Sequence, residues 1–147
     1  MTAVAVVTEI EIERPRADVA AFAADPDNAT AWHAGIKSVQ WQTPKPAVEG
    51  SRIEFTTRFL GRTLEYTYEV IAVEPGERFV MRTDNGRVPM ETAYTWEDCG
   101  VGRTRMTLRN RGMPSGFSKI AAPAIARAMQ RADLKDLERL KALLEAP

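Results

Sequence analysis

The sequence has a single cysteine, Cys99, and a single histidine, His33, in 147 residues. One cysteine cannot form an internal disulfide, which is typical of proteins from a reducing compartment. One histidine, with no His, Cys, Asp and Glu residues at metal-ligand spacing, gives no support to a zinc site. Glycine-rich phosphate loops are also absent from the sequence. We therefore expect a protein without a bound metal or another cofactor.

The chain has neither a charge excess nor a long hydrophobic run. Lys+Arg and Asp+Glu each number 20, whereas nucleic-acid binding usually requires a basic excess. The arginines of residues 103–111 are interpreted as partners in cross-strand ion pairs. No stretch approaches the roughly 20 apolar residues of a membrane span, and a basic n-region typical of a signal peptide is missing. We expect a cytoplasmic protein with no nucleic-acid partner and no integral membrane association.

What the chain does contain is the composition of an ordinary globular domain. Hydrophobic residues make up 44% and charged residues 27% of the sequence, and the length is close to the commonest domain size. No internal repeat or linker interrupts it. We expect residues 1–147 to form one domain, and the sequence leaves open whether that domain forms a homodimer.

Alternating apolar and polar residues predict most of the chain to be strands. Residues 5–13 place Ile10 and Ile12 on one face and glutamates on the other. A short helix follows, and Asp25-Pro26 supplies the N-cap and first-turn signals of a second one that runs to about Trp32. Further strands are expected at residues 36–43, 51–60, 63–73, 78–83, 88–97 and 103–111.

Short turns join these strands, and Pro75-Gly76 and Asn85-Gly86 carry the strongest turn signals. Short connections imply an antiparallel meander, because parallel strands need long crossovers. The last segment, residues 117–145, has helical periodicity, and Pro123 either starts its main helix or kinks it. The apolar stripe of this helix comprises Ala122, Ala126, Met129, Leu137, Leu140 and Leu144.

This order of elements predicts an α+β fold in which one long helix covers the apolar face of a twisted sheet. The helix face at residues 121–132 is mostly alanine, whereas the facing strands carry large aromatic and Met side chains. Small residues opposite large ones can interdigitate tightly. They can equally leave space for a ligand.

Several short motifs in a fixed order resemble a known group of proteins. The chain looks like a member of the START-like, or helix-grip, superfamily, also called SRPBCC, and within it of the polyketide cyclase/dehydrase-like group. The likeness extends over nearly the whole chain and depends on the order of the motifs. They are Ile10-Glu11-Ile12, Arg14-Pro15, Val19-Ala20-Ala21-Phe22, Asp25-Pro26-Asp27-Asn28 before Trp32, the Gly50 segment, Gly61-Arg62-Thr63-Leu64-Glu65-Tyr66, Glu74-Pro75-Gly76-Glu77-Arg78, Gly102-Arg103-Thr104-Arg105 and Asp136-Leu137-Glu138-Arg139-Leu140-Lys141.

The resemblance implies a helix-grip fold, a curved antiparallel sheet of about seven strands with two short helices, wrapped around a long C-terminal helix. It also implies a deep cavity between the sheet and that helix. Members bind lipids, sterols, polyketides, plant hormones and other apolar molecules. Some members are aromatases or cyclases, but they share no catalytic motif, so the fold implies a pocket and not a reaction.

Two titratable residues are candidates for a polar role in such a cavity. His33 follows the second short helix, near where the family's pockets often open, and it either contacts a ligand or acts as an acid or base, or it lies at the surface. Asp133 lies between Met129 and Leu137 on the apolar stripe. A carboxyl group there would have a raised pKa and could orient a polar ligand group. A small rotation of the helix would instead turn Ala132 inward.

Three tyrosines, Tyr66, Tyr68 and Tyr94, alternate onto the expected inner faces of their strands. Their hydroxyl groups could bind a ligand or polarise a substrate carbonyl, or the rings could simply fill the core. Weak candidates for catalysis are Tyr66, Tyr94, Asp133 and His33. The residues expected to line a ligand site are Trp32, Phe59, Tyr66, Tyr68, Met81, Met90, Tyr94, Trp96, Met129 and Asp133.

The sequence therefore supports three hypotheses about function. The first is a binding protein for a small hydrophobic or aromatic molecule, lipid- or polyketide-like, because the expected lining is mainly apolar. The second is a cyclase, aromatase or dehydratase, which would require polar groups that converge inside the cavity. The third is a partner-binding module of the co-chaperone kind, which predicts an exposed apolar patch and a closed cavity.

Overall fold

The computed structural model describes residues 4–83, 90–112 and 121–147. The predicted turn at Asp84-Asn85-Gly86 and the predicted start of the last helix at residues 117–120 lie outside these ranges. The elements are β1 (Val4–Ile12), α1 (Arg16–Ala23), the 3-10 helix η1 (Pro26–Asn28), α2 (Ala29–Trp32), β2 (Ile36–Trp41), β3 (Arg52–Phe59), β4 (Arg62–Glu74), β5 (Arg78–Thr83), β6 (Met90–Asp98), β7 (Thr104–Gly112) and α3 (Ala122–Glu145).

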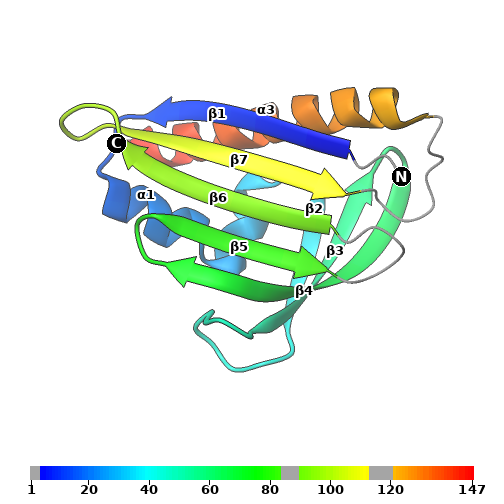
Figure 1. The fold of residues 1–147 in the computed structure, drawn as a ribbon. Coiled ribbons are helices and arrows are strands. Elements are labelled where there is room, and N and C mark those ends of the chain that lie inside the picture. The colour runs from blue at the N-terminus through cyan, green and yellow to red at the C-terminus, as the bar shows by residue number, and fades with distance from the viewer. Residues whose placement is uncertain (1–3, 84–89, 113–120) are drawn as a thin grey trace.

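All seven strands form one antiparallel sheet in the order β1-β7-β6-β5-β4-β3-β2 (Figure 1). The strands β2 to β7 follow one another as the predicted meander, and their described boundaries lie within two residues of those expected. The first strand lies beside the last one, and its register runs from Val4 opposite Gly112 to Ile12 opposite Thr104. The helix-grip fold implied by the resemblance is confirmed.

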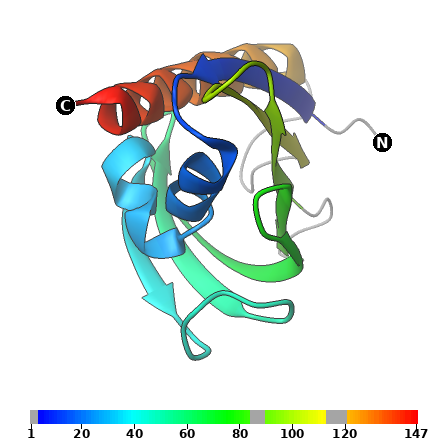
Figure 2. The ribbon, with the colours of Figure 1, turned by 90° about the vertical axis from the view of Figure 1, so that its left-hand side faces the viewer.

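The sheet is strongly curved, and irregularities in two strands contribute to the bend. The register shifts between Ile36 and Ser38 in β2 and between Val70 and Ala72 in β4. Such bulges bend a strand and increase its twist. Seen from the side, the sheet curves around an interior, with α3 along the top and α1 and α2 on the concave side (Figure 2).

The segment between α1 and β2 begins as the sequence predicted. The side chain of Asp25 accepts a hydrogen bond from the backbone N–H of Asp27 at 3.0 Å, and Pro26 occupies the first turn. The predicted second helix is a 3-10 turn followed by the single α-helical turn of α2. This short element ends at Trp32, so His33 leaves it in an extended conformation toward the interior.

The long helix packs its apolar stripe into the curve of the sheet. Ile125, Met129, Leu137 and Leu140 are buried, as is Leu144 near the end. The spacing of three and four residues is that of one helix face. Two aspartates, Asp133 and Asp136, lie on the same buried face. Burial of a carboxyl group without hydrogen-bond partners is costly, so aspartates are unusual on the buried face of a helix.

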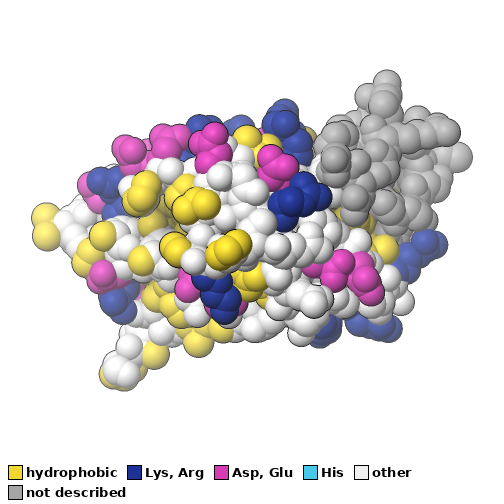
Figure 3. Space-filling view, turned by 90° about the horizontal axis from the view of Figure 1, so that it is seen from below, with side chains coloured by type: hydrophobic (Ala, Val, Ile, Leu, Met, Phe, Trp, Pro, Cys, Tyr) yellow, Lys and Arg dark blue, Asp and Glu magenta, His cyan; other side chains and the backbone are white. Residues whose placement is uncertain are grey.

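The outer face of the sheet carries the expected ion pairs. Arg103 lies 3.2 Å from Glu13, Arg105 lies 3.1 Å from Glu97, and Arg111 lies 3.3 Å from Glu91. On the face seen in Figure 3, basic and acidic side chains are interspersed around hydrophobic ones. Within the described part of the chain, no helix is both long enough and apolar enough to span a bilayer.

Candidate ligand-binding cavity

The concave side of the sheet, the segment from α1 to β2, and α3 surround a cavity of about 190 Å³. This volume is the space open to the centre of a water-sized sphere, and a single water molecule needs only about 10–15 Å³ of it. The cavity is therefore large enough for an organic molecule. Eight of the residues expected at a ligand site line this cavity, namely Phe59, Tyr66, Tyr68, Met81, Met90, Tyr94, Met129 and Asp133.

Two of the expected residues lie elsewhere. Trp32 is fully buried behind the wall, with its ring centroid 5.6 Å from that of Tyr94. Trp96 follows Tyr94 on the same face of β6, with ring centroids 6.1 Å apart, and borders a separate depression beside α1. Alternation along a strand correctly gave the face of Trp96, but the cavity does not extend that far along the strand.

The structure brings both Ala132 and Asp133 to the cavity wall. The sequence posed them as alternatives because neighbouring helix positions point about 100° apart. The cavity is wide enough for α3 to present both. Asp133 is the more deeply buried residue, with 8% of its surface exposed.

Aromatic rings form the apolar part of the wall. The rings of Tyr66 and Tyr68 are stacked, with centroids 6.4 Å apart, and Phe55 lies 5.6 Å from Tyr68. Phe79 stacks on Tyr94 at 6.0 Å. Burial raises the pKa of Tyr68 to about 12 and also raises the pKa of Tyr94. Both hydroxyl groups therefore keep their protons near neutral pH and can donate hydrogen bonds.

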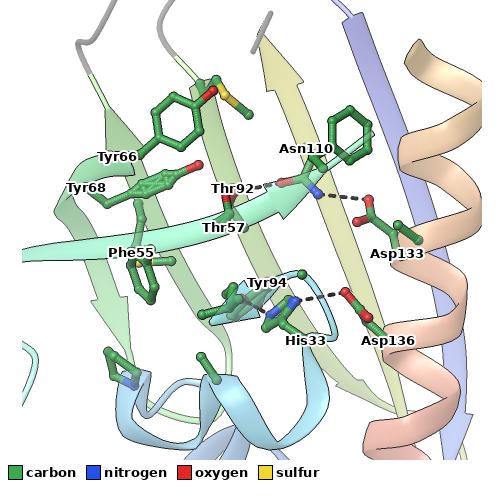
Figure 4. A pocket seen from close by; sticks show the side chains of 18 of the residues that line it. His33, Phe55, Thr57, Tyr66, Tyr68, Thr92, Tyr94, Asn110, Asp133 and Asp136 are labelled. Carbon is green, nitrogen blue, oxygen red and sulfur yellow. Dashed lines mark hydrogen bonds and ion pairs between the residues drawn. The ribbon is translucent and has the colours of Figure 1, made fainter. Parts of the chain in front are cut away.

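A chain of hydrogen bonds crosses the cavity from β6 to α3 through His33 (Figure 4). The hydroxyl group of Tyr94 lies 3.0 Å from His33 Nε2, and His33 Nδ1 lies 3.1 Å from Asp136 Oδ2. The other carboxylate oxygen of Asp136 accepts the backbone N–H of Ala34 at 3.1 Å. His33 and Asp136 are thus fixed in position by contacts from three parts of the chain.

The partners of His33 determine where its protons lie. A carboxylate only accepts, so Nδ1 carries a proton and donates it to Asp136. In the neutral ring Nε2 then accepts from the Tyr94 hydroxyl group. In the protonated ring Nε2 donates to Tyr94, which frees the tyrosine proton for another acceptor. The Tyr94-His33-Asp136 chain can therefore transfer a proton to or from the cavity.

A second chain runs parallel to the first and also ends on α3. Thr92 Oγ1 donates to Asn110 Oδ1 at 2.6 Å, and Asn110 Nδ2 donates to Asp133 Oδ2 at 2.8 Å. While Asp133 is ionised its carboxylate can only accept, so the amide nitrogen of Asn110 must face Asp133 and the amide oxygen must face Thr92. Figure 4 shows Asp133 and Asp136 pointing from the same side of α3 toward the sheet.

Asp133 has an unusual electrostatic environment. Burial raises the pKa of its carboxyl group from 3.8 to about 6, and the hydrogen bond from Asn110 only partly opposes this shift. Desolvation penalises the charged form of an acid and so favours the protonated one. The group changes its charge in a range where an unperturbed aspartate would be fully ionised.

Sequence reasoning missed three of these polar residues: Thr92, Asn110 and Asp136. Signals for them existed. Thr92 precedes Tyr94 on the same strand face, Asn110 continues the inward alternation of Leu108, and Asp136 lies one turn after Asp133. What could not be predicted from the sequence is that residues so distant along the chain meet at one cavity.

Among the described residues, no cluster of His, Cys, Asp and Glu could hold a metal ion.

Solved structures with the same fold confirm the architecture. A START superfamily protein from Mycobacterium smegmatis has a TM-score of 0.81 at 11% identity, covering 96% of this chain and 97% of its own. A protein from Thermus thermophilus has a TM-score of 0.79 at 16% identity, covering 97% and 99%. The Zhui aromatase/cyclase from Streptomyces sp. R1128 has a TM-score of 0.75 at 13% identity, covering 99% and 98%.

The family assignment comes from the sequence as a whole. No curated protein matches the chain. Residues 3–145 do match one protein family, and the match includes every element described above. The chain belongs to the family described as polyketide cyclase / dehydrase and lipid transport.

Proposed function

We propose that the protein binds a small hydrophobic or aromatic molecule in the cavity between the sheet and α3. The observation that carries the proposal is the lining of the cavity, which is largely aromatic and aliphatic and includes a hydrogen-bonded group of polar residues from β6, β7, α3 and His33. Ligand sites usually combine an apolar lining with a few convergent polar groups that orient the ligand.

Burial of apolar surface provides the driving force for this binding. Each Å² of apolar surface removed from water contributes about 25 cal/mol. The stacked rings of Tyr66 and Tyr68 offer a flat surface to a planar ligand, and offset stacking adds to the burial term. The polar wall then restricts the orientations in which the ligand can lie, because buried polar groups require partners.

A second candidate is an enzyme of the cyclase, aromatase or dehydratase kind, and one observation favours it. The Tyr94-His33-Asp136 chain places an acid–base group at the cavity wall, with the imidazole oriented by a carboxylate. Such an arrangement can accept a proton from a substrate and return it.

The large exposed hydrophobic residues among the described ones are scattered over separate strands, turns and helix positions. This distribution gives less support to a partner-binding module, which would present a continuous apolar patch.

The proposal is tested by titrating the protein with N-phenyl-1-naphthylamine, a largely uncharged dye whose emission rises when it leaves water. We expect saturable binding of one dye molecule per chain and a rise in melting temperature with dye concentration. Ala132→Phe should abolish this binding, because the added ring occupies the cavity. Ala142→Phe introduces the same ring at an exposed position of the same helix and should leave binding intact.

Correct folding of both variants is checked by circular dichroism before the titration. Saturable binding that survives Ala132→Phe would place the dye outside the cavity and overturn the proposal. An absence of saturable binding to the folded wild-type protein would overturn it as well. Native mass spectrometry of freshly purified protein gives an independent test, because a molecule that co-purifies can be identified and then offered as a substrate.

A further inference from the structure

The two oxygens of the Asp133 carboxyl group differ in their hydrogen bonding. Oδ2 accepts from Asn110 at 2.8 Å, whereas Oδ1 has no hydrogen-bond partner among the described residues. The residue is more than nine-tenths buried, with 8% exposed, and lines the cavity. Asp133 lines the cavity, and its Oδ1 is not among the enclosed side-chain atoms that lack a partner. A molecule in the cavity can therefore bring a hydrogen-bond donor to this oxygen, in a setting where charge-assisted hydrogen bonds are strong.

Two arginines near the cavity bind other groups. Arg58 lines the cavity, but its Nη1 donates to Thr63 Oγ1 at 3.1 Å at an exposed position. Arg139 Nη1 donates to the backbone oxygen of Trp32 at 3.0 Å and lies 3.5 Å from Asp136. Neither residue forms an ion pair with Asp133 in the described structure. A protonated His33 lowers the pKa of Asp133, and when His33 is neutral a cationic group in the cavity would balance the negative charge of Asp133.

We propose that the ligand is an amphiphile whose polar end is a protonated amine, and that the free oxygen of Asp133 binds this end while the aromatic wall holds the apolar body. The inference rests on the proposed function, since it names the class of molecule that the cavity takes. It assigns to Asp133 the role of selecting the ligand by charge. Asn110 positions the carboxylate by holding its other oxygen.

The same wall disfavours ligands with a carboxylate. Asp136 follows Asp133 by one helical turn and points to the same side (Figure 4), so an acidic ligand would meet two carboxyl groups. Attraction and repulsion between charges are stronger in an enclosed apolar site than in water. The tyrosine ring faces add to the preference, because a cation is attracted to the face of an aromatic ring. Fatty acids are therefore poor candidates for the natural ligand.

The experiment compares four compounds that share a naphthalene body, each displacing the dye. They are 2-(2-naphthyl)ethylamine, 2-(2-naphthyl)ethanol, 2-naphthylacetic acid and 2-ethylnaphthalene. Near pH 7.5, above the pKa of about 6 of Asp133, we expect the amine to bind about tenfold more tightly than ethylnaphthalene, and the acid to bind most weakly. Asp133→Asn should remove the preference for the amine over ethylnaphthalene. Glu138→Gln makes the same chemical change on the exposed face of α3 and should preserve the preference.

The pH dependence of the wild-type protein provides a test that needs no variant at Asp133. The amine remains protonated below pH 8, so its advantage should shrink as the pH falls through about 6. The groups that face Asp133 are Asn110 of β7, Tyr94 of β6, Tyr68 of β4, His33 after α2, and Asp136 of its own helix. The series is repeated in His33→Asn, where the dependence should persist.

The outcomes separate this inference from the proposed function. If all four compounds displace the dye with no preference for the amine, the cavity binds apolar molecules and the charge selection is wrong. A preference that survives Asp133→Asn would likewise overturn it. If neither the dye nor any of the four compounds binds, both the inference and the proposed function fail.

Discussion

At the scale of single residues, Asp133 links the cavity to the stability of the fold. Its pKa rises from 3.8 to about 6 on folding because the carboxyl group is buried. The folded protein therefore holds more protons than the unfolded chain between these two values. Stability contributed by this group is fully present below pH 4 and is lost as the pH rises through about 6.

Replacement of Asp133 by Asn should remove this loss. Two pKa units correspond to about 3 kcal/mol as an order of magnitude. We expect the free energy of unfolding of Asp133→Asn, relative to wild type, to increase by roughly that amount between pH 4 and pH 8. Urea denaturation at both pH values measures it. Parallel pH profiles for the two proteins would show that Asp133 is not desolvated in the folded state.

At the scale of elements, the turn between β3 and β4 combines an unfavourable residue with a favourable one. Phe59 pairs with Arg62, so Leu60 and Gly61 form a two-residue turn with φ values of 50° and 78°. Positive φ at both positions is typical of a type I′ turn, for which Asn-Gly is preferred. Leucine gives no turn signal, which is why the expected strands, residues 51–60 and 63–73, leave residues 61 and 62 between them, one residue later than the observed turn.

Leu60→Asn should therefore stabilise the protein. Asn tolerates the left-handed conformation better than Leu, whose Cβ is crowded there. Leu60 is 54% exposed, so little packing is lost. We expect a gain of about 0.5–1 kcal/mol in the free energy of unfolding, measured by chemical denaturation. Val101→Asn, at an exposed position without positive φ, is the control and should change stability by less than about 0.5 kcal/mol.

At the scale of the whole molecule, the sheet and α3 stabilise each other through the buried stripe of the helix. Leu137 is fully buried in the core that includes Leu108 and Ile12, whereas Leu143 of the same helix is 44% exposed. Leu137→Ala should cost about 2–5 kcal/mol of unfolding free energy, because it leaves a cavity in close-packed surroundings. Leu143→Ala should cost less than about 0.5 kcal/mol. Equal costs, measured by urea denaturation, would contradict this placement of the helix.

Alternation and helical periodicity sufficed to predict the architecture, because each buried face repeats its pattern over many residues. Sequence reasoning found the apolar wall of the candidate site for the same reason. The polar wall is different, since Thr92, His33 and Asp136 come from separate elements and become neighbours only when the sheet curves. The pairing of β1 with β7 could not be predicted either, because no short turn connects them.

The contact between Trp32 and His33 gives the molecule an optical consequence. Their ring centroids lie 3.7 Å apart, and Trp32 has no exposed surface. A protonated imidazole quenches the fluorescence of an adjacent indole, whereas a neutral one does so weakly. The emission of Trp32 thus reports the protonation of the Tyr94-His33-Asp136 chain without any label, and comparison with Trp32→Phe separates this signal from that of Trp41 and Trp96. The protonation of the chain can in this way be followed by intrinsic fluorescence in the unlabelled protein, with or without a ligand.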